Sequence, residues 1–144
     1  MRRPSGDDGQ LAILLIGFVV VALALVSVVT AATNVHLTRA RLAALADLAA
    51  LDAADAIGRT AYYLPDGDAT LTDEGVAAAV GEYLRDHPDP GAGEAVHVVE
   101  ATSPDGRTVR VTLGSVARPA LVAWLPGDVG DGFALVGSSS ARAW

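Results

Sequence analysis

The stretch LAILLIGFVVVALALVSVVTAA, residues 11–32, decides the architecture of this chain, because it contains no charged residue. At about 1.5 Å per residue it makes a helix of roughly 33 Å, and the hydrocarbon core of a bilayer is about 30 Å thick. The other residues are too few and too polar to bury such a helix in a soluble core. The stretch therefore predicts a transmembrane helix over residues 11–33, preceded by a cytoplasmic tail over residues 1–10.

A cleaved signal peptide is the alternative interpretation of this stretch. The apolar region of a signal peptide spans about 7–15 residues and ends before a small-x-small site. Here the apolar run is longer and continues into helix-favouring sequence, although residues 30–32 (Thr-Ala-Ala) resemble a cleavage site. Basic residues flank both ends of the run, so the positive-inside rule is nearly balanced. The short N-terminal tail favours a single-pass cell-membrane protein with its N-terminus inside and its C-terminal domain outside.

The composition excludes several classes of function. The 144 residues include no cysteine and no lysine, which excludes thiolate metal sites, cysteine nucleophiles, Schiff-base lysines and P-loop lysines. The net charge is −7, and all of it falls beyond residue 35. Because an acidic surface repels phosphate backbones, we expect no nucleic-acid partner.

The helical pattern continues beyond the apolar run, over residues 34–57. Alanine, leucine and arginine are strong helix formers, and neither glycine nor proline interrupts residues 18–57. One helix is therefore expected over residues 11–57, with Gly58 near its C-terminus. A helix-packing face is predicted from four leucines that recur among the alanines: Leu42, Leu45, Leu48 and Leu51. This face could pack on the protein's own sheet, or part of it could pack on neighbouring subunits.

Residues 58–144 are predicted to form a small extracytoplasmic α+β domain. A loop over residues 58–72 precedes a helix that Thr72 caps and that ends near Arg85. Leu71 and Val76 have the spacing of a hydrophobic staple across the start of that helix.

The sheet of this domain is expected to contain three short strands. Strands over residues 95–102 and 107–113 flank the tight-turn sequence Ser-Pro-Asp-Gly at 103–106. A short apolar loop or helical turn follows, and residues 133–142 supply the third strand. The predicted fold class is α+β, with a long helical spine against a small antiparallel sheet.

The N-terminal third of the chain resembles the TadE/TadG-like family of Flp (tight adherence) pilus-assembly proteins. The resemblance rests on DGQ at residues 8–10 before the apolar helix, RAR at 39–41 and ADLAALDAA at 46–54. The later sequence VRVT at 109–112 is similar to the C-terminal strands of that family. The alanine-rich, arginine-rich, lysine-free style resembles actinobacterial members.

This resemblance implies a minor pilin or pseudopilin whose helix packs with other pilins, with pilus-assembly membrane proteins or with a type II/IV-like secretion apparatus. It also implies a prepilin peptidase that cuts after Gly9 and leaves Gln10 as the new N-terminus. Processed members carry a glutamate at the fifth mature position, and this chain has Leu14 there. Leucine cannot neutralise the N-terminal amine of a neighbouring subunit. Two roles therefore stay open: a cleaved subunit of a fibre, and an uncut assembly protein of the membrane.

No catalytic or metal-binding pattern accompanies these features. His36, His87 and His97 are far apart in the sequence, and the HExxH, GxSxG and P-loop motifs are absent. We expect no metal, no cofactor and no enzymatic activity. A membrane-tethered extracytoplasmic binding module and a small exported enzyme are the competing hypotheses. A tethered module would more often have a Pro/Gly/Ser linker after the membrane, so the uninterrupted helix favours the assembly component.

Overall fold

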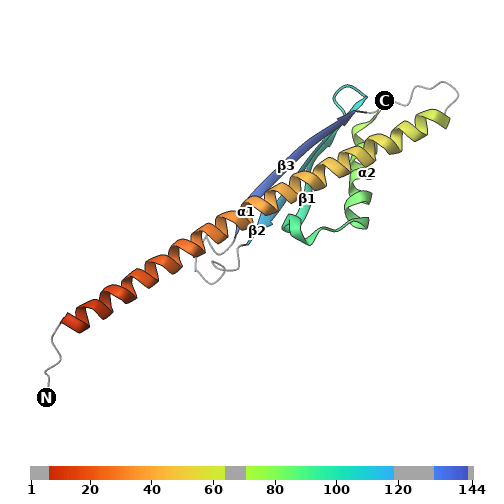
Figure 1. Cartoon of the computed structure of the whole chain (residues 1–144). Coiled ribbons are helices and arrows are strands. Elements are labelled where there is room, and N and C mark those ends of the chain that lie inside the picture. Colours follow the sequence, from red (N-terminus) through yellow and green to blue (C-terminus); the bar gives the residue numbers. More distant parts are fainter. Residues whose placement is uncertain (1–6, 64–70, 119–131, 143–144) are drawn as a thin grey trace, which may run out of the picture.

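The computed structural model describes residues 7–63, 71–118 and 132–142. These residues form an α+β fold, as predicted, in which one very long helix runs beside a small sheet (Figure 1). The elements in chain order are α1 (Asp7–Tyr63), α2 (Asp73–Asp86), the 3₁₀ helix η1 (Pro90–Ala92), β1 (Glu94–Thr102), β2 (Thr108–Ala117) and β3 (Phe133–Arg142).

Helix α1 is longer than predicted at both ends. It begins at Asp7 and ends at Tyr63, a length of 57 residues or roughly 85 Å. The expected stop at Gly58 is therefore wrong, because a glycine inside a helix costs only about 1 kcal/mol. Proline is the stronger stop signal, and Pro65 follows two residues after the helix ends. Of the loop predicted over residues 58–72, the part at 64–70 lies outside the described residues.

The three strands form an antiparallel sheet in the order β1-β2-β3. β2 and β3 pair without interruption from Thr108↔Arg142 to Ala117↔Phe133. β1 has two register shifts against β2, the second between Val98 and Glu100. Val96 packs on the core, and after the second shift Ala101 does so as well. A strict two-residue alternation would place these two residues on opposite faces, so the shift keeps an apolar side chain on the core at both ends of β1.

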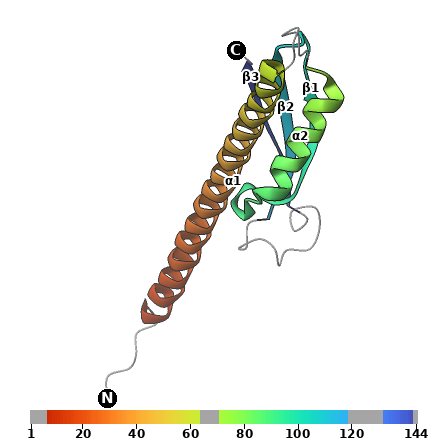
Figure 2. The ribbon, with the colours of Figure 1, turned by 90° about the vertical axis from the view of Figure 1, so that its right-hand side faces the viewer.

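Both α-helices cover the same face of the sheet (Figure 2). α1 contacts β2 and β3, and α2 contacts β1 and α1. The largest fully buried apolar side chains come from α1, α2 and β2: Leu42, Val76, Val80, Val109, Val111 and Leu113. The second half of α1 is thus one wall of the domain, while its first half extends away from it (Figure 1).

The start of α2 confirms the predicted capping. Thr72 is the N-cap, and its hydroxyl oxygen accepts a hydrogen bond from the Gly75 N–H at 3.2 Å. Leu71 and Val76 are both buried in the core, as a hydrophobic staple requires. α2 ends at Asp86, one residue beyond the predicted end near Arg85 and two residues before Pro88.

The turn between β1 and β2 is organised by one carboxylate. Asp105 Oδ1 accepts hydrogen bonds from the backbone N–H groups of Arg107 and Thr108, and Asp105 Oδ2 accepts one from the Thr108 hydroxyl at 2.8 Å. Gly106 has φ of +68°, a conformation that glycine adopts at little cost. The tight turn predicted at 103–106 is therefore present.

Candidate functional site: the exposed surfaces of helix α1

The first half of α1 exposes its apolar side chains on all sides. Every large hydrophobic residue from Leu11 to Val29 is exposed, and α1 is long and apolar enough to cross a membrane. The hydroxyls of Ser27 and Thr30 donate to the carbonyl oxygens of Leu23 and Val26 at 2.9 and 2.8 Å. Both hydroxyls are hydrogen-bonded within the helix and so add little cost to burial in lipid.

The second half of α1 packs closely on the sheet through small residues. Its core positions are largely alanines, and the fully buried ones are Ala46, Ala49, Ala50 and Ala53. Opposite them on β3, a Cβ added to Gly137 would lie 2.9 Å from the Ala43 backbone nitrogen. The Ser139 hydroxyl donates to Asp47 Oδ1 at 2.7 Å beside this contact. The helix and the strand therefore approach almost backbone to backbone.

The four predicted helix-packing leucines divide between two sides of α1. Leu42 and Leu45 are buried in the core of the domain, whereas Leu48 and Leu51 are 51% and 48% exposed. Residues three apart are separated by about 300° around a helix, so each step falls back by about 60°. From Leu42 to Leu51 the side chains therefore turn half-way round the helix. Packing on the protein's own sheet accounts for the first two leucines only.

An exposed, uncharged stripe runs along the side of α1 that faces away from the core. We call it the outer stripe, and it contains Leu37, Ala40, Ala44, Leu48 and Leu51. Leu37 is 50% exposed, close to the values for Leu48 and Leu51. The spacing of three or four residues keeps all five on one face. The sequence pattern alone did not include Leu37, because only the position of the sheet shows which side of the helix stays uncovered.

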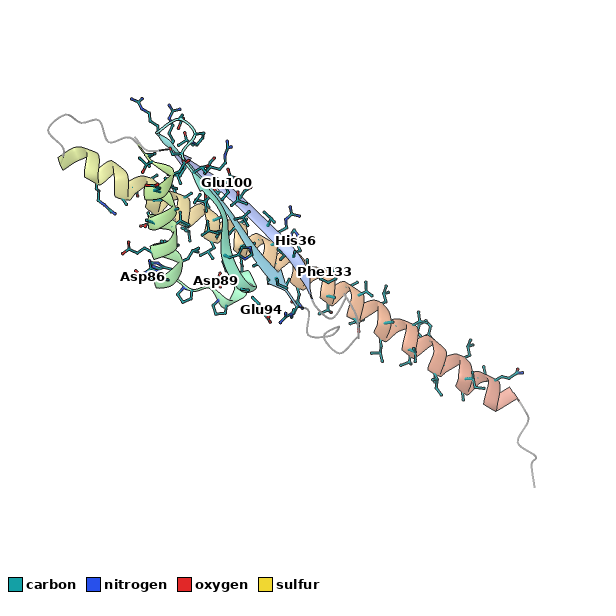
Figure 3. The ribbon with its side chains drawn as sticks, turned by 180° about the vertical axis from the view of Figure 1, so that it is seen from behind. His36, Asp86, Asp89, Glu94, Glu100 and Phe133 are labelled. Atoms are coloured by element: carbon teal, nitrogen blue, oxygen red, sulfur yellow. The ribbon has the colours of Figure 1, made fainter. Side chains whose placement is uncertain are left out.

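A groove lies where α1 leaves the apolar run and meets the start of β3. Its volume is about 500 Å³, and Figure 3 shows His36 on α1 beside Phe133 on β3 at this end of the domain. The lining residues are Val28, Ala31, Ala32, Val35, His36, Arg39, Phe133 and Leu135. The groove is apolar except for His36 and Arg39. No pattern in the sequence indicates this groove, because its two walls come from residues about a hundred positions apart.

The predicted processing site lies at the free end of α1. Gly9 and Gln10 are exposed, within the first turn of the helix, and no atom lies within 4 Å of a Cβ added to Gly9. Leu14, at the fifth position of the predicted mature chain, is also exposed on this helix. Cleavage between Gly9 and Gln10 stays a prediction.

The histidines are placed on three different elements. His36 lies on α1, His87 is the C-cap of α2, and His97 lies on β1 above Gly114. In residues 7–63, 71–118 and 132–142 no three His, Asp or Glu side chains are grouped to hold a metal ion. One carboxyl, Asp105, has a pKa below its ordinary value of 3.8, mainly because the Thr108 hydroxyl donates to it and because two backbone N–H groups do so as well.

Residues 9–56 match the family described as putative Flp pilus-assembly TadE/G-like. We call residues 9–56 the TadE/G-like segment. The resemblance predicted from this part of the sequence is confirmed over these residues, which are a third of the chain. No curated protein and no solved structure matches the chain significantly.

The TadE/G-like segment coincides with most of helix α1. It contains Gly9, all four predicted packing leucines and the whole outer stripe, and it ends at residue 56, before α1 does. The sheet and α2 lie outside the matched residues, as does the sequence at 109–112 that also resembled the family. The match names no bacterial group, so the actinobacterial character stays a prediction.

Proposed function

We propose that the protein is a membrane-anchored, pilin-like component of Flp/Tad-type pilus assembly or secretion that acts by helix packing and performs no catalysis. In this proposal residues 11–33 span the cell membrane, the N-terminus is inside, and the sheet domain is outside. The observation that carries the proposal is the TadE/G-like segment, whose apolar half is exposed on every side and whose other half carries the outer stripe.

The outer stripe is the surface through which we propose that α1 contacts other pilins or pilus-assembly membrane proteins. Small and aliphatic residues in a row allow two helices to approach closely. The core of the protein itself uses Leu42 and Leu45, so Leu48 and Leu51 are left for a partner. Because the stripe starts at Leu37, just above the apolar run, a partner helix could follow α1 from the membrane into the domain.

Site-directed crosslinking tests this packing without interference, because the chain has no cysteine. Leu51→Cys, loaded with a photoreactive maleimide in native membranes, should crosslink to a pilin or assembly protein that mass spectrometry identifies. Glu74→Cys on the exposed start of α2 is the matched control and should give little product. Equal yields at the two positions would exclude the outer stripe as the contact surface.

The N-terminus of the mature protein decides between the two roles in assembly. Intact mass and N-terminal sequence would be measured for protein from membranes and from a sheared surface fraction. A start at Gln10 with material in the sheared fraction supports a subunit processed by prepilin peptidase. An uncut chain confined to membranes supports an assembly protein, or a tethered binding module without a pilus role if crosslinking finds no pilus partner. A start near Thr33 would refute the membrane anchor.

A further inference from the structure

We propose that the groove between α1 and the start of β3 binds an anionic phospholipid of the surrounding membrane, with its acyl chain along the apolar wall and its headgroup phosphate at His36 and Arg39. This inference rests on the membrane-anchored topology proposed above. It adds a specific lipid site to it.

The residues that α1 contributes to the groove change from apolar to polar along the helix axis, from the membrane half toward the domain. The lower wall of the groove, with Val28, Ala31 and Ala32, belongs to the apolar run of α1. His36 and Arg39 lie four and seven residues beyond Ala32, or about 6 and 10 Å along the helix axis. The polar zone of a bilayer begins at the edge of the hydrocarbon core and is about 5–8 Å thick, so the backbone of His36 lies within this zone and that of Arg39 lies just beyond it. The order of groups in the groove is therefore that of a phospholipid, with tails below and phosphate above.

The two polar side chains of the groove, His36 and Arg39, lean toward the membrane half of α1. In an α-helix the Cα–Cβ bonds tilt toward the N-terminus. The N-terminal half of α1 is the membrane half in the proposed topology, so the side chains of His36 and Arg39 lean toward the lipid headgroups. A long arginine side chain can also extend to the interface while its methylene groups cover apolar surface.

The groove carries basic groups in a protein that is acidic as a whole. The protein carries a net charge of −7, yet the groove contains a guanidinium and an imidazole and no carboxylate. Arg39 has no ion-pair partner among the residues that the structure describes. The nearby Arg118, by contrast, is paired with Glu94 at 2.7 Å. An unpaired arginine is a good ligand for a phosphate, which it can bind with two parallel hydrogen bonds.

Strand β3 gives the groove a second wall that a bare helix would lack. Phe133 is 46% exposed and Leu135 is buried, and both come from β3. An acyl chain that lies along Val28 and Val35 would cover the exposed ring of Phe133. A free phosphate ion would leave this apolar wall in water, so the groove favours a phospholipid over a soluble anion.

Native mass spectrometry of the full chain in detergent tests the site. Dioleoylphosphatidylglycerol and dioleoylphosphatidylcholine, which share their acyl chains, would be added at equal concentration. The wild type should bind the anionic lipid more tightly, and Arg39→Gln should weaken that binding by roughly fivefold, the contribution of one basic residue near an anionic lipid surface. Arg39→Lys should retain most of the preference, because it keeps the charge. Arg110→Gln, an equal change of charge on the exposed side of β2, should have no effect.

Three results would overturn the lipid site. The first is equal binding of the two lipids by the wild type, and the second is equal losses in Arg39→Gln and Arg110→Gln. The third is displacement of the lipid by inorganic phosphate at equal concentration, since the apolar wall would then contribute nothing to binding. Alkaline extraction of membranes separates this failure from failure of the proposed function. A protein that resists extraction but shows no lipid preference keeps its anchor and lacks the site, whereas an extracted protein lacks the anchor itself.

Discussion

Gly137 sets the distance between α1 and β3, because its missing side chain leaves room for the helix backbone. A Cβ at this position would lie 2.9 Å from the Ala43 nitrogen and 3.0 Å from the Leu42 carbonyl carbon. Backbone atoms cannot rotate away as a side-chain end can. The alanines of α1 allow this close approach only because position 137 on β3 also lacks a side chain.

Gly137→Ala should therefore destabilise the domain by about 1–3 kcal/mol, the usual cost of overpacking. Thermal unfolding in detergent, followed by circular dichroism, measures the effect. Gly81→Ala in α2 is the matched control, since no atom lies within 4 Å of its added Cβ. Alanine in a helix interior should stabilise that variant by up to about 1 kcal/mol. A Gly137→Ala protein as stable as the wild type would show that α1 and β3 can separate without cost.

Asp105 links the stability of the β1–β2 turn to pH. Hydrogen bonds from Thr108 and Arg107 hold its pKa below 3.8 in the folded protein. The unfolded chain then takes up the proton at a higher pH than the folded chain does, so this contribution to stability is present above about pH 4 and is lost as the pH falls through the folded pKa.

Asp105→Asn should lower the melting temperature at about pH 5 and should flatten its fall between about pH 5 and pH 2. The asparagine keeps one acceptor oxygen but no charge, so the turn loses its charge-assisted bonds. Carbon-13 NMR of the Asp105 carboxyl group in the wild type gives the direct measurement. A titration midpoint at or above 3.8 would contradict the hydrogen bonding described for this turn.

Helix α1 presents two functionally different sides within its second half. One side completes the core of the domain, and the opposite side is the outer stripe. The two sides can be tested separately, because Leu42 and Leu51 have the same side chain and lie half a turn apart around the same helix.

Leu42→Ala should cost about 2–5 kcal/mol of domain stability, because it leaves a cavity in a fully buried site. Leu51→Ala should change stability by less than about 0.5 kcal/mol, as surface substitutions usually do, yet it should reduce recovery of pilus-assembly partners with the protein. Unfolding measurements and co-purification from membranes provide the two readouts. A large loss of stability in Leu51→Ala would mean that this side of α1 also belongs to the core.

The elements that could be predicted from the sequence are those fixed by local chemistry. The apolar run, the cap at Thr72 and the tight turn at 103–106 each depend on neighbours in the chain, and each appears in the structure. The stop at Gly58 failed because glycine only weakens a helix, whereas the proline that follows prevents its continuation.

The features that could not be predicted depend on contacts between distant residues. The division of the leucines into buried and exposed pairs follows from where the sheet meets α1, and no local pattern records that. The groove joins Arg39 to Phe133, which are brought together by the pairing of β3 with β2 and the packing of α1 on both strands. Which side chains of β1 face the core likewise depends on the register shift between Val98 and Glu100, and no glycine, proline or other turn residue at this point of the sequence indicates it.

The whole molecule is an acidic domain at one end of a long apolar helix. Its fifteen acidic groups and eight arginines are too costly to bury in the hydrocarbon core of a bilayer, whereas the apolar run enters that core readily. The proposed topology places every described strand outside the cell and the short N-terminal tail inside.

Single cysteines test this topology in whole cells. Ser138→Cys, on the exposed side of β3, should react with a membrane-impermeant maleimide. In the uncut chain, Ser5→Cys in the N-terminal tail should react only after the membrane is permeabilised. The reverse pattern would show that the domain faces the cytoplasm, and equal reaction of both without permeabilisation would show that the chain does not span the membrane.

The continuity of α1 has a mechanical consequence. The described helix is unbroken from the apolar run to the part that packs on the sheet. The rotation of the sheet about the helix axis, relative to the membrane part of α1, is therefore fixed by the number of residues between Ala32 and Leu42. Each residue added or removed there would swing the sheet by about 100° and shift its height by about 1.5 Å. A neighbouring molecule that packs on α1 within the lipid therefore also determines which surface of the domain points toward the next molecule.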